Sequence, residues 1–202
     1  MAVDGYMYFE HYKNQGFLPS ESQVDVSKSG KGEILFTAFE KFKKAAETKK
    51  DNSMSCLFEV EDFGFGIEQV LNIGSQSTGA GAGRVTFNPF TINRKIDMSS
   101  PQLYEMACSG TPFQEVGLAL RKGSGGDASG KIYLVFLFKL VAVKTITWSY
   151  DDESPKEAIE FEYGGLQVWY SPQNGDGTMT SKFGGGWNRV RNVVDKTKDP
   201  IV

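Results

Sequence analysis

Alternating apolar and polar positions predict that most of this chain forms antiparallel β-strands. Residues 56–61, 85–88 and 116–121 each place large apolar side chains at every second position. In the first of these segments, Leu57 falls on the polar side together with two glutamates. The pattern is typical of strands that pack one face on a core and leave the other in water.

Residues 132–138 are apolar on both faces and rich in β-branched and aromatic side chains. Such a run predicts a central strand that is covered on both sides, in part by another subunit. A buried helix is the alternative for a short apolar run. The apolar pattern resumes up to Trp148 and then gives way to the acidic segment 151–155, which ends in proline and predicts a loop.

Two alternating runs follow this predicted loop, at 159–163 and 166–170, and Gly164 and Gly165 separate them. Paired glycines between two strand-like runs are typical of a tight β-hairpin turn. We therefore expect the chain to reverse direction at these two residues.

The clearest predicted helix runs from Ser99 to Cys108, because a serine can cap the free amide groups and Pro101 suits the first turn. Gly110 is a natural helix end. A second helix is predicted over 35–50, with its apolar side chains on one face. That apolar face comprises Leu35, Phe36, Phe39, Phe42 and Ala46. We interpret it as a surface helix docked on the strands, with a membrane-surface helix as the alternative.

The composition is that of one ordinary folded domain: 202 residues, 40% of them hydrophobic and 23% charged. The net charge of -3 disfavours nucleic acid and anionic lipid as partners. The longest apolar run, at 132–143, is interrupted by a lysine and too short to insert in a membrane as a helix. The N-terminal residues lack the pattern of a cleavable signal peptide. Cys56 and Cys108 are expected to be reduced and buried.

Residues suited to catalysis are scarce. His11 is the only histidine, and no serine lies in a Gly-x-Ser-x-Gly turn. The glycine-rich segment 79–84 lacks the Gly-Lys-Ser/Thr ending of a phosphate-binding loop, and the carboxylates at 151–153 lack calcium-loop spacing. We therefore predict no catalytic residues, no cofactor and no metal site.

From residue 79 onward the sequence resembles the haemolysin-coregulated protein family (Hcp), the tube protein of bacterial type VI secretion systems. Three blocks carry the resemblance in order and spacing: GAGRVTF at 81–87, DMSSPQL at 97–103 and ACSGTPF at 107–113. Further similar segments lie at 157–163 and 168–173. The segment 35–50 looks like an insertion into the family pattern.

The resemblance implies an all-β, mainly antiparallel fold: a β-barrel of two packed sheets with one flanking helix. This barrel would span residues 1–172, followed by a tail over 173–202 that is glycine-rich and then basic. It also implies that six copies close into a ring, that rings stack into a tube, and that the tube carries small effector proteins in its lumen. The implied partners are a spike protein and a contractile sheath. Assembly would occur in the cytoplasm, followed by secretion.

By the same resemblance, the loop between residues 72 and 83 is expected to reach toward the neighbouring ring. The residues predicted to make this contact are Asn72, Gly74, Ser75, Gln76, Gly79, Gly81 and Gly83.

Two other functions remain open at the level of sequence. A monomeric β-barrel that binds a small ligand would need a large enclosed apolar cavity. An enzyme that uses two carboxylates as acid and base would need a cleft in which they face each other.

Overall fold

The computed structural model describes residues 3–12, 16–22, 41–42, 44–45, 47, 55–72, 81–122, 131–150, 154–172, 174 and 183–195. The helix α2 spans Ser100–Ser109. The described strands are β1 (Val3–His11), β2 (Phe58–Val60), β3 (Asp62–Gly64), β4 (Ile67–Asn72), β5 (Gly81–Phe87), β6 (Phe90–Lys95), β7 (Phe113–Lys122), β8 (Lys131–Tyr150), β9 (Pro155–Tyr170), β10 (Phe183–Asn188) and β11 (Val193–Val194).

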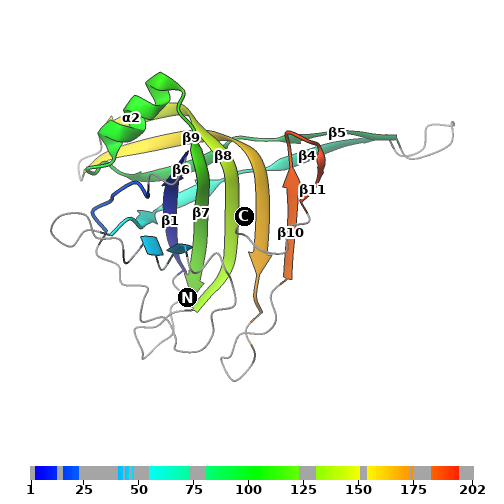
Figure 1. Ribbon diagram of the computed structural model, residues 1–202, viewed down its shortest axis with the longest axis horizontal. Coiled ribbons are helices and arrows are strands. Elements are labelled where there is room, and N and C mark those ends of the chain that lie inside the picture. The colour runs from blue at the N-terminus through cyan, green and yellow to red at the C-terminus, as the bar shows by residue number, and fades with distance from the viewer. Residues whose placement is uncertain are drawn as a thin grey trace.

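One curved, antiparallel sheet forms the body of the molecule (Figure 1). Within the described residues it has nine strands, and its main path runs β11-β10-β9-β8-β7-β1-β2. The first half of β9 also pairs with β6, which in turn pairs with β3. Because β2 and β3 follow each other directly along the chain, the sheet returns to its first strands and closes into a barrel. The predicted antiparallel β-fold with a flanking helix is confirmed.

Aromatic side chains fill the interior of this barrel. The ring of Phe90 stacks on Phe138 with centroids 4.3 Å apart and on Phe161 at 5.9 Å. Phe9 on β1 packs against Phe58 on the adjacent strand β2, with centroids 5.1 Å apart. These side chains are almost completely buried. The interior is therefore a packed core.

The hairpin predicted at Gly164 and Gly165 is wrong, because β9 continues through both glycines as one strand of 16 residues. It pairs with β8 on both sides of this point, from Leu134 opposite Tyr170 to Tyr150 opposite Pro155. The two glycines mark a bend shared by both strands, which Figure 1 shows where β8 and β9 curve over the top of the barrel.

Side-chain direction explains the bend. Along β8 the core residues Phe138 and Val141 are three positions apart instead of two, and along β9 so are Tyr163 and Leu166. Both strands therefore change which parity faces the core at the same level. Leu140 adopts a left-handed φ of 52° there. A β-carbon on Gly164 would lie 3.3 Å from the β-carbon of Leu140, so glycine allows the close approach.

Residues 132–138 in the first half of β8 are covered on both sides, as predicted. The outer face of this half belongs to a second buried cluster that contains Val135, Leu137 and Trp169. Phe42 and Ala45 cover this face from the predicted insertion. Residues 41, 42, 44, 45 and 47 are helical, and the rest of the predicted helix over 35–50 lies outside the described residues.

Leu57 does not lie on a wet face. It is fully buried in the second cluster, beside Cys56. The strand prediction failed at this position because β2 begins only at Phe58, so Leu57 and Cys56 precede the alternating pattern and are both buried in the second cluster. In this segment the two glutamates, Glu59 and Glu61, are exposed as predicted.

Helix α2 begins and ends close to the predicted bounds, with Pro101 in its first turn and Gly110 in the left-handed conformation after its end. The predicted serine cap is wrong, because the side chain of Ser99 makes no capping hydrogen bond. Its hydroxyl donates instead to Asp97 at 2.6 Å. Cys108 is exposed rather than buried. It follows the buried Met106 by two positions and so lies on the opposite side of the helix.

The chain after residue 172 contributes to the main sheet, since β10 pairs with the second half of β9 and β11 pairs with β10. The boundary at residue 172 stays a prediction. In the predicted loop 151–155, residues 151–153 lie outside the described part, and Pro155 already opens β9. No helix among the described residues has the length and apolar character needed to cross a bilayer.

Candidate assembly surfaces

The ribbon formed by β4 and β5 projects away from the barrel (Figure 1). Its base is fixed, because the Asn88 amide donates to the Gly66 carbonyl at 2.9 Å and Phe87 is buried in the barrel core. Its strands pair from Ile67 opposite Phe87 to Asn72 opposite Gly81. An isolated two-stranded ribbon is marginally stable in water and leaves both edges unpaired. Its geometry suits contact with another molecule.

The predicted inter-ring residues divide between two parts of the chain. Asn72, Gly81 and Gly83 lie in the outer part of the ribbon. Gly74, Ser75, Gln76 and Gly79 lie outside the described residues. The structure therefore brings the described members of the predicted set together at the end of the ribbon, and their role in a contact between rings stays a prediction.

A buried ion pair joins the barrel to the start of α2. The guanidinium of Arg94 on β6 donates from Nε to Oε1 of Glu157 on β9 at 2.6 Å. Both side chains are almost fully buried. The indole of Trp148 donates to the second oxygen of Glu157 at 3.1 Å. Arg94 also stacks over the ring of Phe58, 4.9 Å from its centroid.

The same guanidinium binds the segment that leads into α2. One terminal nitrogen of Arg94 donates to Asp97 at 2.7 Å and to the hydroxyl of Ser99 at 2.7 Å. The hydroxyl of Ser100 donates to Glu157 at 2.9 Å. Asp97, Ser99 and Ser100 in the block 97–103 all take part in this network, which fixes the first turn of α2 against the barrel.

Sequence reasoning missed Arg94 and Glu157. The signal was present, because each is a charged residue at a core-facing position of a strand: Arg94 continues the row of Phe90 and Ile92, and Glu157 begins the row of Ile159. Opposite charges at such positions on two strands indicate a buried pair.

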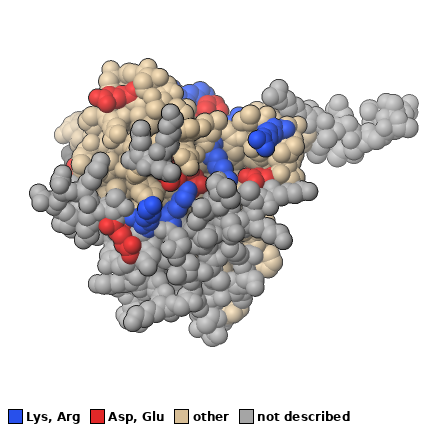
Figure 2. Space-filling model, in the orientation of Figure 1, with Lys and Arg blue, Asp and Glu red and all other residues tan. Residues whose placement is uncertain are grey.

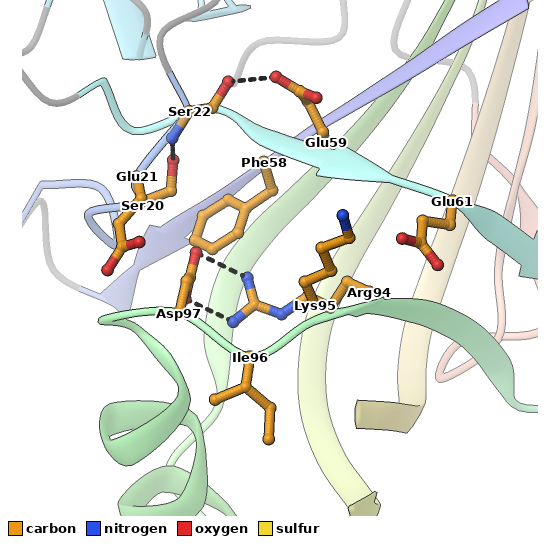
Figure 3. Close-up of a pocket in the computed structure, with 10 residues that line it drawn as sticks. All are labelled: Ser20, Glu21, Ser22, Phe58, Glu59, Glu61, Arg94, Lys95, Ile96 and Asp97. Atoms are coloured by element: carbon orange, nitrogen blue, oxygen red, sulfur yellow. Dashed lines mark hydrogen bonds and ion pairs between the residues drawn. The ribbon is translucent and has the colours of Figure 1, made fainter. Parts of the chain in front are cut away.

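A polar cleft of about 370 Å³ opens beside this network (Figure 3). Its wall consists of Ser20, Glu21, Ser22, Phe58, Glu59, Glu61, Arg94, Lys95, Ile96 and Asp97. Ser22 donates to Glu59 at 2.9 Å, and Glu21 accepts a hydrogen bond from the Met98 amide at 3.1 Å. The cleft is open and half polar, unlike an enclosed apolar ligand cavity. Among the described residues, no group of three or more His, Cys, Asp or Glu side chains is placed to hold a metal ion.

A second ion cluster holds the covering segment on the outer face. Lys41 donates to Glu10 at 2.7 Å and to Glu115 at 3.0 Å. Tyr8 donates to the same oxygen of Glu115 at 2.6 Å. Burial, with the charge of Glu115, raises the pKa of Tyr8 well above its usual value. Burial alone would lower the pKa of Lys41, but Glu115 and Glu10 outweigh it, and the pKa is raised.

Eight of the exposed apolar side chains on the described surface fall into two groups used below. The first, here called the aromatic corner, consists of Ile96, Tyr104, Trp148 and Tyr150 around α2 and the end of β8. The second, here called the β11 edge, consists of Leu140, Val190, Val193 and Val194. Figure 2 shows that the surface over α2 is largely uncharged. Clustered exposed apolar side chains are typical of contact surfaces between proteins.

The chain is similar to known proteins over most of its length. The family model described as "Type VI secretion system effector, Hcp" matches residues 47–170. The protein hcp1 of Pseudomonas aeruginosa is 30% identical over 116 residues, which is 54% of this chain and 68% of that protein.

Solved structures show the same fold at lower identity. A structure of a type six secretion system protein superposes with a TM-score of 0.71 at 20% identity and covers 96% of this chain and 100% of that one. The crystal structure of Hcp1 from Salmonella typhimurium gives a TM-score of 0.60 at 16% identity, with the same coverage.

Proposed function

The chain belongs to the Hcp family of type VI secretion system proteins, and we propose that it acts there as a tube subunit in six-membered rings. The family match over residues 47–170 carries this proposal. That range contains every described strand from β2 to β9 together with α2, and so most of the closed barrel. The exposed aromatic corner and the β11 edge, where the described sheet ends, support self-association, because both leave surface that a neighbour would cover.

The rings are proposed to stack through the β4–β5 ribbon, whose projecting end carries Asn72, Gly81 and Gly83. The stacked tube would be assembled in the cytoplasm, would meet a contractile sheath and a spike protein, and would carry small effector proteins in its lumen. We assign the subunit a structural role without catalysis. The buried charges support this role, because Arg94 and Glu157 bond to each other and to α2.

Native mass spectrometry of the full chain at micromolar concentration tests the ring. We expect a hexamer as the main species, and negative-stain images with ring-shaped particles. A sample that contains only monomers over a hundredfold concentration range would overturn the proposal.

A deletion within the ribbon tests stacking separately from ring closure. Replacing residues 73–80 with a two-residue Asn-Gly turn should leave rings intact, because the barrel is untouched, and should abolish their stacking. Stacks that persist in images of this variant would contradict the proposed role of the ribbon.

A further inference from the structure

We propose that the aromatic corner and the β11 edge are the two halves of one head-to-tail contact, in which the corner of one copy packs on the edge of the next. The inference rests on the proposed ring, and it names the surfaces that close it. The occupant of each surface is a second copy of this chain.

The aromatic corner is a preformed surface. The rings of Tyr104 on α2 and Trp148 on β8 lie 5.7 Å apart between centroids, and about half of each side chain is exposed. Tyr150 follows Trp148 on the same face of β8 and is 76% exposed. The indole of Trp148 is held by the buried Glu157. A rigid aromatic surface loses little entropy when a partner covers it.

The β11 edge is the margin of the main sheet as far as the structure describes it. β11 is the last strand on the sheet's main path, and its residues Val193 and Val194 are both about half exposed. Val190, in the turn before it, is 73% exposed. The strand is nevertheless anchored, since the Asp195 amide donates to the Gly186 carbonyl at 2.9 Å and its carboxylate accepts from Gln167 at 2.7 Å. Val193 and Val194 point to opposite faces of the sheet, and no described strand pairs with the outer side of β11, so the β11 edge presents apolar side chains along an anchored sheet margin.

One pair of exposed charges beside the two surfaces is complementary. Glu105 is exposed next to Tyr104 in the corner, and Arg191 is exposed next to Val190 at the edge. The nearby Arg189 is already engaged by Glu162 at 3.2 Å. A corner packed on another corner would bring two copies of Glu105 together, whereas a corner packed on an edge brings Glu105 to Arg191. The pair Glu105 and Arg191 thus favours the head-to-tail arrangement.

The two surfaces lie at different ends of the molecule. Figure 1 shows α2 at one end of the sheet and β10 with β11 at the other. One copy cannot bring its own surfaces together, so each copy must use one neighbour on each side. A contact between different surfaces with a suitable rotation closes into a ring.

Two single variants at highly exposed positions test the pairing. Tyr150→Asp places a charge in the corner and Val190→Asp places one at the edge, and neither removes a buried side chain. We expect each variant alone to be monomeric by native mass spectrometry. Tyr12→Asp, which changes an exposed aromatic residue outside both surfaces, should still form wild-type rings.

Mixing the two variants gives the sharpest test. The corner variant keeps an intact edge and the edge variant keeps an intact corner, so an equimolar mixture should form one-to-one heterodimers and no rings. Wild-type rings in both single variants would overturn the inference while leaving the tube function standing. A single variant that forms homodimers would also overturn it, because the contact would then be symmetric. Absence of rings in the wild-type chain would instead refute the proposed function.

A charge exchange tests the orientation of the contact. Glu105→Arg and Arg191→Glu should each weaken ring assembly about two- to fivefold, as expected of a charge at the rim of an interface. The double variant should recover wild-type assembly. Failure of the double variant to recover would overturn the assignment of Glu105 and Arg191 as partners across the contact.

Discussion

Gly117 on β7 shows how closely the outer face of the barrel is packed at the level of one residue. A β-carbon at this position would collide with the ring of Tyr8, which crosses it from β1. Tyr8 has no room to move away, because its hydroxyl is bonded to Glu115 and its ring packs edge-on against Phe42 with centroids 4.7 Å apart. Glycine at position 117 therefore leaves the space that Tyr8 occupies, and Tyr8 in turn packs against Phe42 of the segment that covers this face.

Gly117→Ala is therefore expected to lower the free energy of unfolding by about 1–3 kcal/mol, the usual cost of overpacking. Urea denaturation at fixed protein concentration measures it. Gly185→Ala is the matched control, because a β-carbon on this β10 glycine meets nothing within 4 Å. The control should change the free energy of unfolding by less than about 0.5 kcal/mol. Equal stability of the two variants would show that Tyr8 can move.

At the scale of elements, the pair Arg94 and Glu157 connects β6 and β9 and also holds the start of α2. Since the helix supplies Tyr104 to the aromatic corner, the pair also positions a proposed contact surface. The pair stabilises the fold because each of its two charges is bonded to the other and to further polar groups. Removing one charge leaves the other buried and uncompensated.

Glu157→Gln should destabilise the fold by about 3–5 kcal/mol, the usual result of breaking a buried ion pair from one side. Glu160→Gln on the same strand is the control, because the half-exposed Glu160 lies 3.9 Å from Lys144 and such a pair is worth about 0–1 kcal/mol. Thermal and urea unfolding compare the two variants. A loss below about 1 kcal/mol for Glu157→Gln would contradict the structural role given to the pair.

The strands could be predicted from sequence where the burial of a few consecutive residues shows directly in their apolar pattern. Residues 116–121 and 132–138 lie in β7 and β8 as expected, because apolar periodicity reports burial directly. Gly164 and Gly165 were misread, because glycine allows a bend as readily as a turn and only the partner strand decides between them. The pairing of Arg94 with Glu157 spans 63 positions in sequence, so neither residue's neighbours reveal it.

At the scale of the whole molecule, the closed barrel has one core inside and a second cluster on its outer face. Both bury ionisable side chains that stay protonated. Burial raises the pKa of Tyr6 to about 12, against the opposing effect of Arg121. Burial also raises the pKa of Tyr163, and the pKa values of Tyr8 and Lys41 are raised as well.

These shifts predict loss of stability at alkaline pH. In the unfolded chain tyrosine and lysine release their protons near pH 10, whereas in the folded chain these groups keep them to higher pH. Above pH 10 the unfolded state therefore binds fewer protons, and the free energy of unfolding falls as pH rises through the folded pKa values. Below pH 10 this contribution is fully present.

Urea unfolding between pH 9 and 12, at constant ionic strength, measures the fall. Tyr6→Phe should make it shallower between pH 10 and 12, because one of the contributing protons is removed. An unchanged slope in this variant, or constant stability up to pH 12, would contradict the prediction.

The shared bend in β8 and β9 also restricts how the gene can change. Both strands change the side-chain parity that faces the core at Leu140 and Gly164. Deletion of one codon on either side of that level would therefore move the core-facing side chains of one strand to its outer face, while the paired strand kept its orientation. Length variation among descendants of this chain should therefore accumulate in its connecting segments, and β8 and β9 should keep constant lengths on each side of the bend.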